Sequence, residues 1–264
     1  MHEHIAVVVP TFNEGQRIER TIRAIHAYLS SSRESYEIII ADDGSSDATG
    51  RIVTRLMQEP MPIRLLLGKT NRGKGNAVRR GVAASTADLI LVTDADLATP
   101  IEEVEKLLER VRAGADIAIG SRGLGSSHIS VHQPVYRELL GKSFNLLVQA
   151  AILPGIWDTQ CGFKLFRGPI ARGLFPHSTI DRFAFDVEVL GLAARAGFRI
   201  AEVPVRWSHI SHSRVRLGRD GARMLWDMIK VAYKLRTGGY ALSDLVPVRA
   251  ETEPSVAPSK PTAT

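Results

Sequence analysis

Short apolar runs alternate with longer amphipathic segments through the first 120 residues of this 264-residue chain. Apolar runs of five or six residues predict strands, and apolar positions at helical spacing predict helices between them. The expected strands are residues 5–9, 37–41, 63–67, 88–93 and 116–120, and the expected helices are residues 14–29, 47–58, 73–84 and 101–112. Such alternation predicts an α/β fold with a mostly parallel central sheet flanked by helices, and with ligands at the carboxyl ends of the strands.

The second half of the chain is less regular. Its patterns predict helices at residues 134–152, 185–196 and 220–236 and strands at residues 163–166 and 198–203. No stretch resembles a linker, so we expect one domain over residues 1–240, with a nucleotide half at 1–122 and an acceptor half at 123–240. Residues 248–264 are rich in Pro, Ser, Thr and Ala and predict a disordered tail.

Composition restricts the compartment and the partners. The single cysteine, Cys161, excludes an internal disulfide and is typical of a reducing compartment. No signal-peptide core is visible, and no segment approaches the roughly 20 apolar residues that span a bilayer, so we expect a cytoplasmic protein. The net charge of +6 favours an anionic partner, which is nucleic acid, an anionic membrane surface or a phosphorylated substrate.

Two carboxylates follow the apolar run at residues 89–93, in the sequence Asp94-Ala95-Asp96. Strand alternation places Asp94 and Asp96 on the same side at the carboxyl end of the strand. Two adjacent anions need a cation, and Mg²⁺ or Mn²⁺ prefers such oxygen ligands. The pattern therefore predicts a metal site that holds a diphosphate and stabilises its charge as it leaves.

Polar loops also end the first two predicted strands. Pro10, Thr11, Asn13 and Glu14 follow the first strand, and the run Asp42-Asp43-Gly44-Ser45-Ser46-Asp47 follows the second. Carboxylates and amides at these ends are suited to read a base and a ribose by hydrogen bonds. The alternative is that Asn13, Ser46 and Asp47 only cap the following helices. Adjacent acids such as Asp42 and Asp43 repel each other without a partner, which favours a binding role.

A third loop, at residues 71–75, opens a helix and contains Gly73, Lys74 and Gly75. Its glycines allow a close backbone approach, and Lys74 and the helix N-terminus attract a diphosphate. The chain has no Gly-x-Gly-x-x-Gly pattern after the first strand and no P-loop, which argues against a dinucleotide enzyme or an ATPase.

These motifs, in this order and together with Gly120-Ser121-Arg122, resemble those of family 2 glycosyltransferases, which have the GT-A fold and use nucleotide-sugar donors. The runs at residues 158–166 and 183–188 sharpen the resemblance to the dolichyl-phosphate β-glucosyltransferases, which move glucose from UDP-glucose to a polyprenyl phosphate. The resemblance covers roughly residues 5–240.

The resemblance implies a role for each motif residue. The nucleotide-sugar site would be lined by Pro10, Thr11, Asn13, Glu14, Asp42, Asp43, Lys74, Asp94 and Ala95. Asp96 would be the principal ligand of Mg²⁺ or Mn²⁺, with Asp94 at the ribose or diphosphate. Related mannosyltransferases have a glutamine where this chain has Ala98, so a water or another residue must complete the metal shell here.

A phosphomonoester acceptor is largely a dianion at neutral pH and needs cations that hold it in line with the sugar. Arg122 and Arg137 are the candidates, and Arg214 is a third at the acceptor or diphosphate. The acids that face sugar or acceptor are expected to be Asp158, Asp186 and Glu188, with Gln160 at the pocket floor. We expect direct displacement with inversion and no nucleophilic role for Cys161.

The helices predicted near residues 140–152 and 220–236 are amphipathic, and the second is basic and aromatic, which favours peripheral contact with a membrane surface over simple core packing. Four alternatives remain open: a GDP-mannose-dependent enzyme, a soluble or polysaccharide acceptor, a sugar-nucleotide-binding protein without catalysis, and a nucleic-acid-binding protein. Nucleic acid explains the basic charge but not the acidic strand ends, so no nucleic-acid partner is expected. The sequence makes no prediction of an oligomeric state.

Overall fold

A computed structural model describes residues 3–32, 35–131, 135–209, 217–242 and 245 of the chain. Its centre is a seven-stranded sheet with the strand order β3-β2-β1-β4-β7-β5-β8. The strands of this sheet are β1 (Ile5–Thr11), β2 (Tyr36–Asp42), β3 (Ile63–Leu67), β4 (Leu89–Thr93), β5 (Ile117–Ser121), β7 (Phe163–Arg167) and β8 (Ile200–Pro204). Only β7 runs antiparallel to its neighbours β4 and β5, so the predicted, mostly parallel α/β sheet is confirmed.

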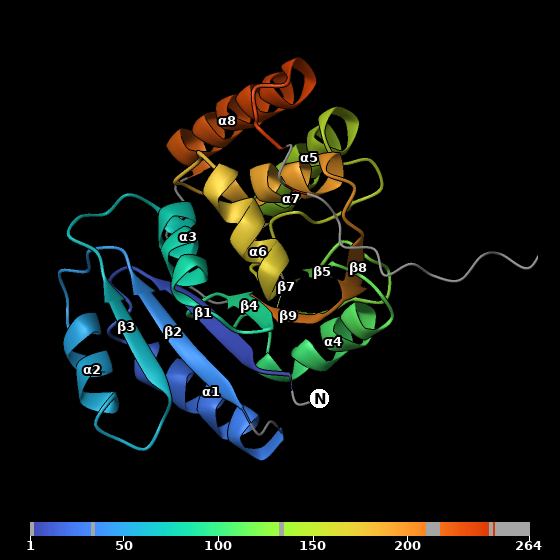
Figure 1. The fold of residues 1–264 in the computed structure, drawn as a ribbon. Coiled ribbons are helices and arrows are strands. Elements are labelled where there is room, and N and C mark those ends of the chain that lie inside the picture. Colours follow the sequence, from blue (N-terminus) through green and yellow to red (C-terminus); the bar gives the residue numbers. More distant parts are fainter. Residues whose placement is uncertain (1–2, 33–34, 132–134, 210–216, 243–244, 246–264) are drawn as a thin grey trace, which may run out of the picture.

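Helices cover both faces of the sheet (Figure 1). On one face lie α1 (Ile18–Ser32), α2 (Thr49–Leu56) and α4 (Val104–Arg112), the last preceded by the short η1 (Ile101–Glu103). On the other face lie α3 (Lys74–Ala84), α6 (Gly168–Leu174), η2 (Phe175–His177) and α7 (Phe185–Arg195). Beyond α7, α5 (Val135–Ala151) and α8 (Leu217–Thr237) lie side by side at one end of the molecule.

A hydrophobic core lies on each face of the sheet, which explains why the strand sequences are continuous apolar runs. Every residue of β4 and β5 is buried, because helices cover both faces of these strands. In α1 the buried residues Ile18, Ile22, Ile25 and Leu29 recur at helical spacing and pack against the sheet.

The predicted helices and strands are present, with ends that shift by a few residues. The elements absent from the prediction are α6, the short η2 and a two-stranded parallel sheet of β6 (His128–Val131) and β9 (Arg206–Ser208). β6 and β9 are too short to show a clear alternation of apolar and polar residues. The tail at residues 248–264 lies outside the described residues.

The carboxyl ends of the parallel strands lie at one edge of the sheet. The polar loops that follow β1, β2 and β4 therefore lie together at this edge. β7 and β8 come from the second half of the chain, so residues from both halves reach this edge. Among the described residues, no helix is long and apolar enough to cross a membrane.

Candidate active site

The loops after β1 and β2 are joined by hydrogen bonds. The Asn13 side-chain oxygen accepts from the backbone N–H of Ser46 at 2.8 Å, and the Asn13 backbone N–H donates to Ser45 Oγ at 2.7 Å. Asp47 accepts from the backbone N–H of Thr49 at 2.9 Å, as expected for a residue that precedes α2. Asn13 therefore ties the two loops together.

Pro10 and Thr11 are the last residues of β1, and Glu14 lies in the loop that follows. The hydroxyl group of Thr11 donates to Asp42 at 3.4 Å, and its carbonyl accepts from the backbone N–H of Asp43 at 2.8 Å. Glu14 pairs with Arg17 at 2.8 Å. These contacts fix the β1 loop against the end of β2.

Asp42 and Asp43 are both buried, and each carboxylate has hydrogen-bond donors from the protein. Asp42 accepts from the backbone N–H of Ser45 at 2.9 Å and from the Ser45 hydroxyl. Asp43 accepts from the backbone N–H groups of Gly73 at 2.6 Å and Arg72 at 3.2 Å, and burial raises the pKa of Asp43. Backbone donors thus relieve the repulsion between these acids, and Asp43 fixes the loop that carries Lys74.

The glycines of that loop admit a neighbouring protein segment. Gly73 has a φ of 128°, and a Cβ there would fall 2.4 Å from the carbonyl oxygen of Asp181. A Cβ on Gly75 would fall 2.5 Å from the carbonyl oxygen of Ile180. The sequence argument assigned the close approach to a ligand, whereas in this structure the segment before α7 occupies that space.

Lys74 stands at the N-terminus of α3 and points toward β4. Its Nζ lies 2.6 Å from Asp94 Oδ1 and 5.9 Å from the ring centroid of Phe185. Burial would lower the pKa of Lys74, but the charges of Asp94 and Asp186 outweigh it and raise that pKa. Lys74 is therefore a permanent cation beside the paired aspartates.

Asp94 and Asp96 lie in a tight turn, closed by a hydrogen bond of 3.2 Å from the backbone N–H of Leu97 to the carbonyl of Asp94. Leu97 has a φ of 49° and Asn13 a φ of 54°, and these are the only non-glycine residues of the described chain with positive φ. Such backbone strain concentrates at functional sites. Behind the turn, Gly162 lies so close that a Cβ there would meet Asp94 Oδ2 at 2.0 Å.

The two aspartates fit a divalent cation. Burial and then the negative charge of Asp94 raise the pKa of Asp96, so the pair carries more negative charge than Lys74 alone relieves. Carboxylate oxygens are hard ligands that suit Mg²⁺ or Mn²⁺. No group of three or more His, Cys, Asp or Glu side chains in the described part of the chain forms a metal cluster. Asp94 and Asp96 would thus bind such an ion together with oxygens from elsewhere.

Arg122, at the end of β5, forms a two-pronged ion pair with Asp158. Arg122 Nε lies 2.7 Å from Asp158 Oδ2 and Nη2 lies 2.9 Å from Oδ1, while the indole of Trp207 lies 5.4 Å from the guanidinium carbon. Burial opposes ionisation of Asp158, but the charge of Arg122 holds its pKa below the usual range. Asp158 thus positions Arg122 and leaves further N–H donors of the guanidinium for a ligand.

Asp186, at the start of α7, pairs with a buried lysine of β7. Lys164 Nζ lies 2.6 Å from Asp186 Oδ1 and donates to the carbonyl of Cys161 at 2.5 Å. Burial raises the pKa of Asp186, against the opposite effects of Lys164 and Lys74. Cys161 is buried, and burial raises the pKa of its thiol to about 11, so it carries little thiolate at neutral pH.

The structure separates several predicted residues from this centre. The side chain of Ala95 packs in the core, and its carbonyl accepts from Thr21. Gln160, in contrast, stays beside the site, because its backbone N–H donates to Asp158 at 3.2 Å. Glu188 is fully buried and accepts from Ser178, Thr179, Ile180 and Tyr240.

Two predicted arginines are not part of the described site. The side chain of Arg137 on α5 and the whole of Arg214 lie outside the described residues.

The sequence argument missed three contributors to the site. Gly162, Lys164 and Trp207 contact Asp94, Asp186 and Arg122. The only signal for the first two was their place in the run at residues 158–166, and Trp207 lies in β9, which was not predicted.

Comparison with known proteins adds sequence similarity to this geometry. The family model described as glycosyl transferase family 2 matches residues 6–175. A dolichyl-phosphate β-glucosyltransferase from Trichomonas vaginalis is 38% identical over 247 residues, which cover 90% of this chain and 73% of the relative. The enzyme of that name from Dictyostelium discoideum is 37% identical, over 89% of this chain and 76% of its own.

A solved structure supports the fold independently. Glucosyl-3-phosphoglycerate synthase from Mycobacterium tuberculosis, in complex with Mn²⁺, UDP-glucose and phosphoglyceric acid, superposes with a TM-score of 0.64 at 19% identity. The match covers 88% of this chain and 79% of that one. The predicted GT-A fold is therefore confirmed, and at this identity the likeness concerns the fold alone.

Proposed function

Because the chain belongs to glycosyltransferase family 2, we propose that it transfers glucose from UDP-glucose to the phosphate of a polyprenyl phosphate. The observation that carries this proposal is the cluster of Lys74, Asp94 and Asp96 at the carboxyl ends of the strands, in a chain similar over most of its length to dolichyl-phosphate β-glucosyltransferases.

The donor would lie across the ends of β1, β2 and β4. The joined loops after β1 and β2 offer Asn13 and Asp42 for the nucleoside, and Lys74 stands where a diphosphate needs a cation. Asp94 and Asp96 would hold Mg²⁺ or Mn²⁺ there. When bound, this ion neutralises the diphosphate charge that grows as the sugar leaves.

The acceptor phosphate would approach from the side of Arg122. The guanidinium is held by Asp158 and stacked on Trp207, and its remaining donors are suited to a phosphate oxygen. That oxygen attacks the anomeric carbon as the bond from this carbon to the diphosphate oxygen breaks, and UDP leaves with the electron pair. The acceptor is already a dianion, so no proton has to move, and the product is β-linked from an α-linked donor.

A lipid acceptor places the reaction at a membrane surface. We propose peripheral attachment at the cytoplasmic face through α5 and α8, whose outer sides expose Leu139, Leu146, Trp226 and Tyr233. Amphipathic helices with aromatic and basic residues bind such surfaces.

The test is glucosyl transfer by the purified chain. A short-chain polyprenyl phosphate with Mg²⁺ is incubated with UDP-glucose, UDP-N-acetylglucosamine or GDP-mannose, and lipid-linked sugar is measured. We expect product from UDP-glucose and its loss in Asp96→Ala, whereas Glu109→Ala, which removes an exposed acid on α4, retains activity.

The other outcomes separate the alternatives. Product from GDP-mannose alone would assign the mannosyl branch. Release of UDP without lipid product would refute the polyprenyl phosphate acceptor and favour a soluble or polysaccharide acceptor. Absence of turnover with any donor would favour a protein that binds sugar nucleotides without catalysis.

A further inference from the structure

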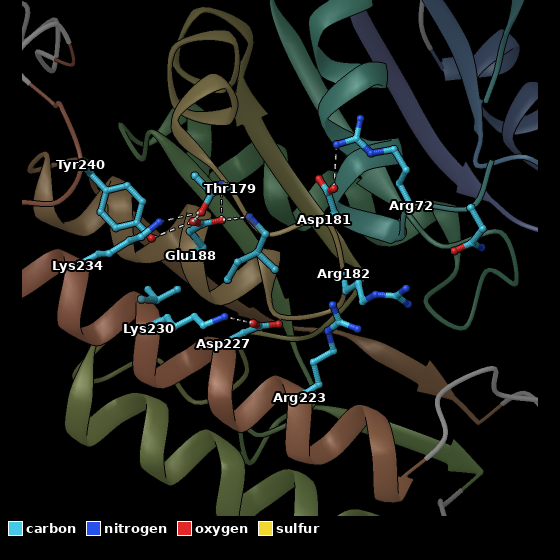
Figure 2. Close-up of a pocket in the computed structure, with 13 residues that line it drawn as sticks. Arg72, Thr179, Asp181, Arg182, Glu188, Arg223, Asp227, Lys230, Lys234 and Tyr240 are labelled. Atoms are coloured by element: carbon cyan, nitrogen blue, oxygen red, sulfur yellow. Dashed lines mark hydrogen bonds and ion pairs between the residues drawn. The ribbon is translucent and has the colours of Figure 1, made fainter. Parts of the chain in front are cut away.

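A polar pocket lies on the α8 side of the segment that precedes α7. This cavity of about 470 Å³ is bounded by Asn71–Arg72, by residues 179–182 and by one face of α8 (Figure 2). Five of its lining residues are cationic, and three are acidic. The cationic residues are Arg72, Arg182, Arg223, Lys230 and Lys234.

The three acidic residues of the pocket already form ion pairs or accept hydrogen bonds from other groups of the protein. Asp181 is shared by Arg72 at 3.0 Å and Arg79 at 2.9 Å, and Asp227 lies 3.9 Å from Lys230. Glu188 is buried under its protein donors, as described above. The pocket therefore carries a surplus of positive charge.

Two guanidinium groups carry part of that surplus, together with Lys234, whose Nζ donates to the Thr179 hydroxyl at 3.3 Å. Arg182 and Arg223 have no carboxylate within ion-pair distance among the residues that the structure describes. Figure 2 shows Arg223 extending from α8 toward the segment that carries Arg182. Two guanidiniums that share a pocket repel each other unless an anion lies with them, and phosphate is the anion that a planar guanidinium binds bidentately.

The neighbouring face of α8 indicates where such a phosphate comes from. Arg223, Lys230 and Lys234 recur at helical spacing along the pocket. The adjacent face of the helix exposes Trp226 (58% exposed) and Tyr233 (68% exposed), together with Leu225 and Ile229. A helix with an apolar row beside a basic row lies in a membrane interface, where its cations meet headgroup phosphates.

We propose that this pocket binds the phosphate of an anionic phospholipid headgroup between Arg182 and Arg223. The pocket adjoins the proposed donor site, because a Cβ on Gly73 would fall 2.9 Å from the Arg182 side chain. Among the described residues, Asp94 pairs with Lys74 and Arg122 with Asp158, and neither of the two arginines forms an ion pair with these groups. The proposal does not depend on which sugar or acceptor the enzyme uses.

The experiment is flotation of the full chain with vesicles at physiological salt. Phosphatidylcholine vesicles with about 30% phosphatidylglycerol are compared with pure phosphatidylcholine. The double variant R182Q/R223Q is compared with R195Q/R236Q, which removes two exposed arginines of α7 and α8 that do not line the pocket. We expect roughly a tenfold higher lipid requirement for R182Q/R223Q and a much smaller change for R195Q/R236Q.

Equal losses in the two double variants would overturn the proposal, since they would mean a diffuse attraction to the surface. Unchanged binding of R182Q/R223Q would overturn it as well. A thermal shift with inorganic phosphate that R182Q/R223Q abolishes, at equal vesicle binding of both variants, would assign a soluble phosphate and refute the lipid source.

The thermal shift by UDP and Mg²⁺ is measured in parallel. Its retention in R182Q/R223Q, together with the loss of vesicle binding, supports a separate site. Its disappearance would place the arginines in donor binding and overturn the proposal. Failure of the glucosyl-transfer assay alone would touch only the proposed function.

Discussion

The carboxylate of Asp94 lies directly against the α-carbon of Gly162, where a Cβ would fall 2.0 Å from Asp94 Oδ2. The other carboxylate oxygen, Asp94 Oδ1, forms an ion pair with Lys74 Nζ at 2.6 Å. Gly162 thus leaves room for the Asp94 carboxylate, and only a residue without a side chain fits there.

We predict that Gly162→Ala displaces Asp94 and lowers kcat for glucosyl transfer by about 100-fold, because misplacement of a catalytic group by about 1 Å has an effect of this size. Gly125→Ala is the matched control, since nothing lies within 4 Å of a Cβ there. Steady-state kinetics and a thermal melt of each variant check the prediction. Normal kcat in Gly162→Ala would contradict this need for a glycine.

The fold was predictable because its signal is periodic. Apolar runs such as those of β1 and β4 are buried on both faces, and the buried residues of α1 recur at helical spacing. β9 has three residues and pairs with β6 across a large sequence separation, so neither carries a local pattern. Its residue Trp207, which stacks on Arg122, was therefore missed.

The identity of the main site residues was predictable from the sequence, but most of their hydrogen-bond partners were not. The strand-end rule located Asp42, Lys74, Asp94 and Asp96 at one edge of the sheet. It did not reveal which hydrogen-bonding atoms of these side chains are already engaged by other groups of the protein. Asp43 accepts from backbone N–H groups that only the folded chain brings together, across a separation of about 30 residues.

Asp158→Asn is predicted to destabilise the protein. Asn retains the shape but leaves the guanidinium of Arg122 without its charge partner, and removal of one member of a buried ion pair costs about 3 kcal/mol. Chemical denaturation of the wild type and the variant measures this loss. Glu109→Gln, at an exposed position of α4, is the control and should change the free energy of unfolding little. An unchanged midpoint for Asp158→Asn would contradict the prediction.

Glu188→Gln is predicted to lower stability rather than donor or acceptor binding. The carboxylate accepts from the backbone N–H groups of Thr179 and Ile180 at 2.9 and 2.8 Å and from the hydroxyl of Tyr240 at 2.8 Å. An amide NH₂ in place of one oxygen would oppose these donors, with a loss of about 2 kcal/mol.

The thermal midpoint and the KM for each substrate are to be measured together for Glu188→Gln. A raised KM at an unchanged midpoint would instead support the contact with sugar or acceptor that the sequence suggested.

Asp96→Asn is predicted to stabilise the ligand-free protein while it abolishes the thermal shift by UDP and Mg²⁺. Burial and Asp94 raise the pKa of Asp96 above its value in the unfolded chain. The folded protein therefore binds a proton here at a higher pH than the unfolded chain does, and ionised Asp96 destabilises the fold as pH rises through that range. Removal of the charge should add about 1 kcal/mol near pH 8, a common gain when a strained functional group is replaced.

The sign of the pH dependence is the decisive part of this prediction. At low pH Asp96 is protonated in the wild type, so the two proteins should melt at similar temperatures, and the advantage of Asp96→Asn should grow as the pH is raised. Thermal melts without ligand between about pH 3 and 8, a range that starts below the unfolded carboxyl pKa, give the difference directly. An advantage that is largest at low pH would mean that Asp96 is stabilised in its charged form, and it would contradict a site that needs an added cation.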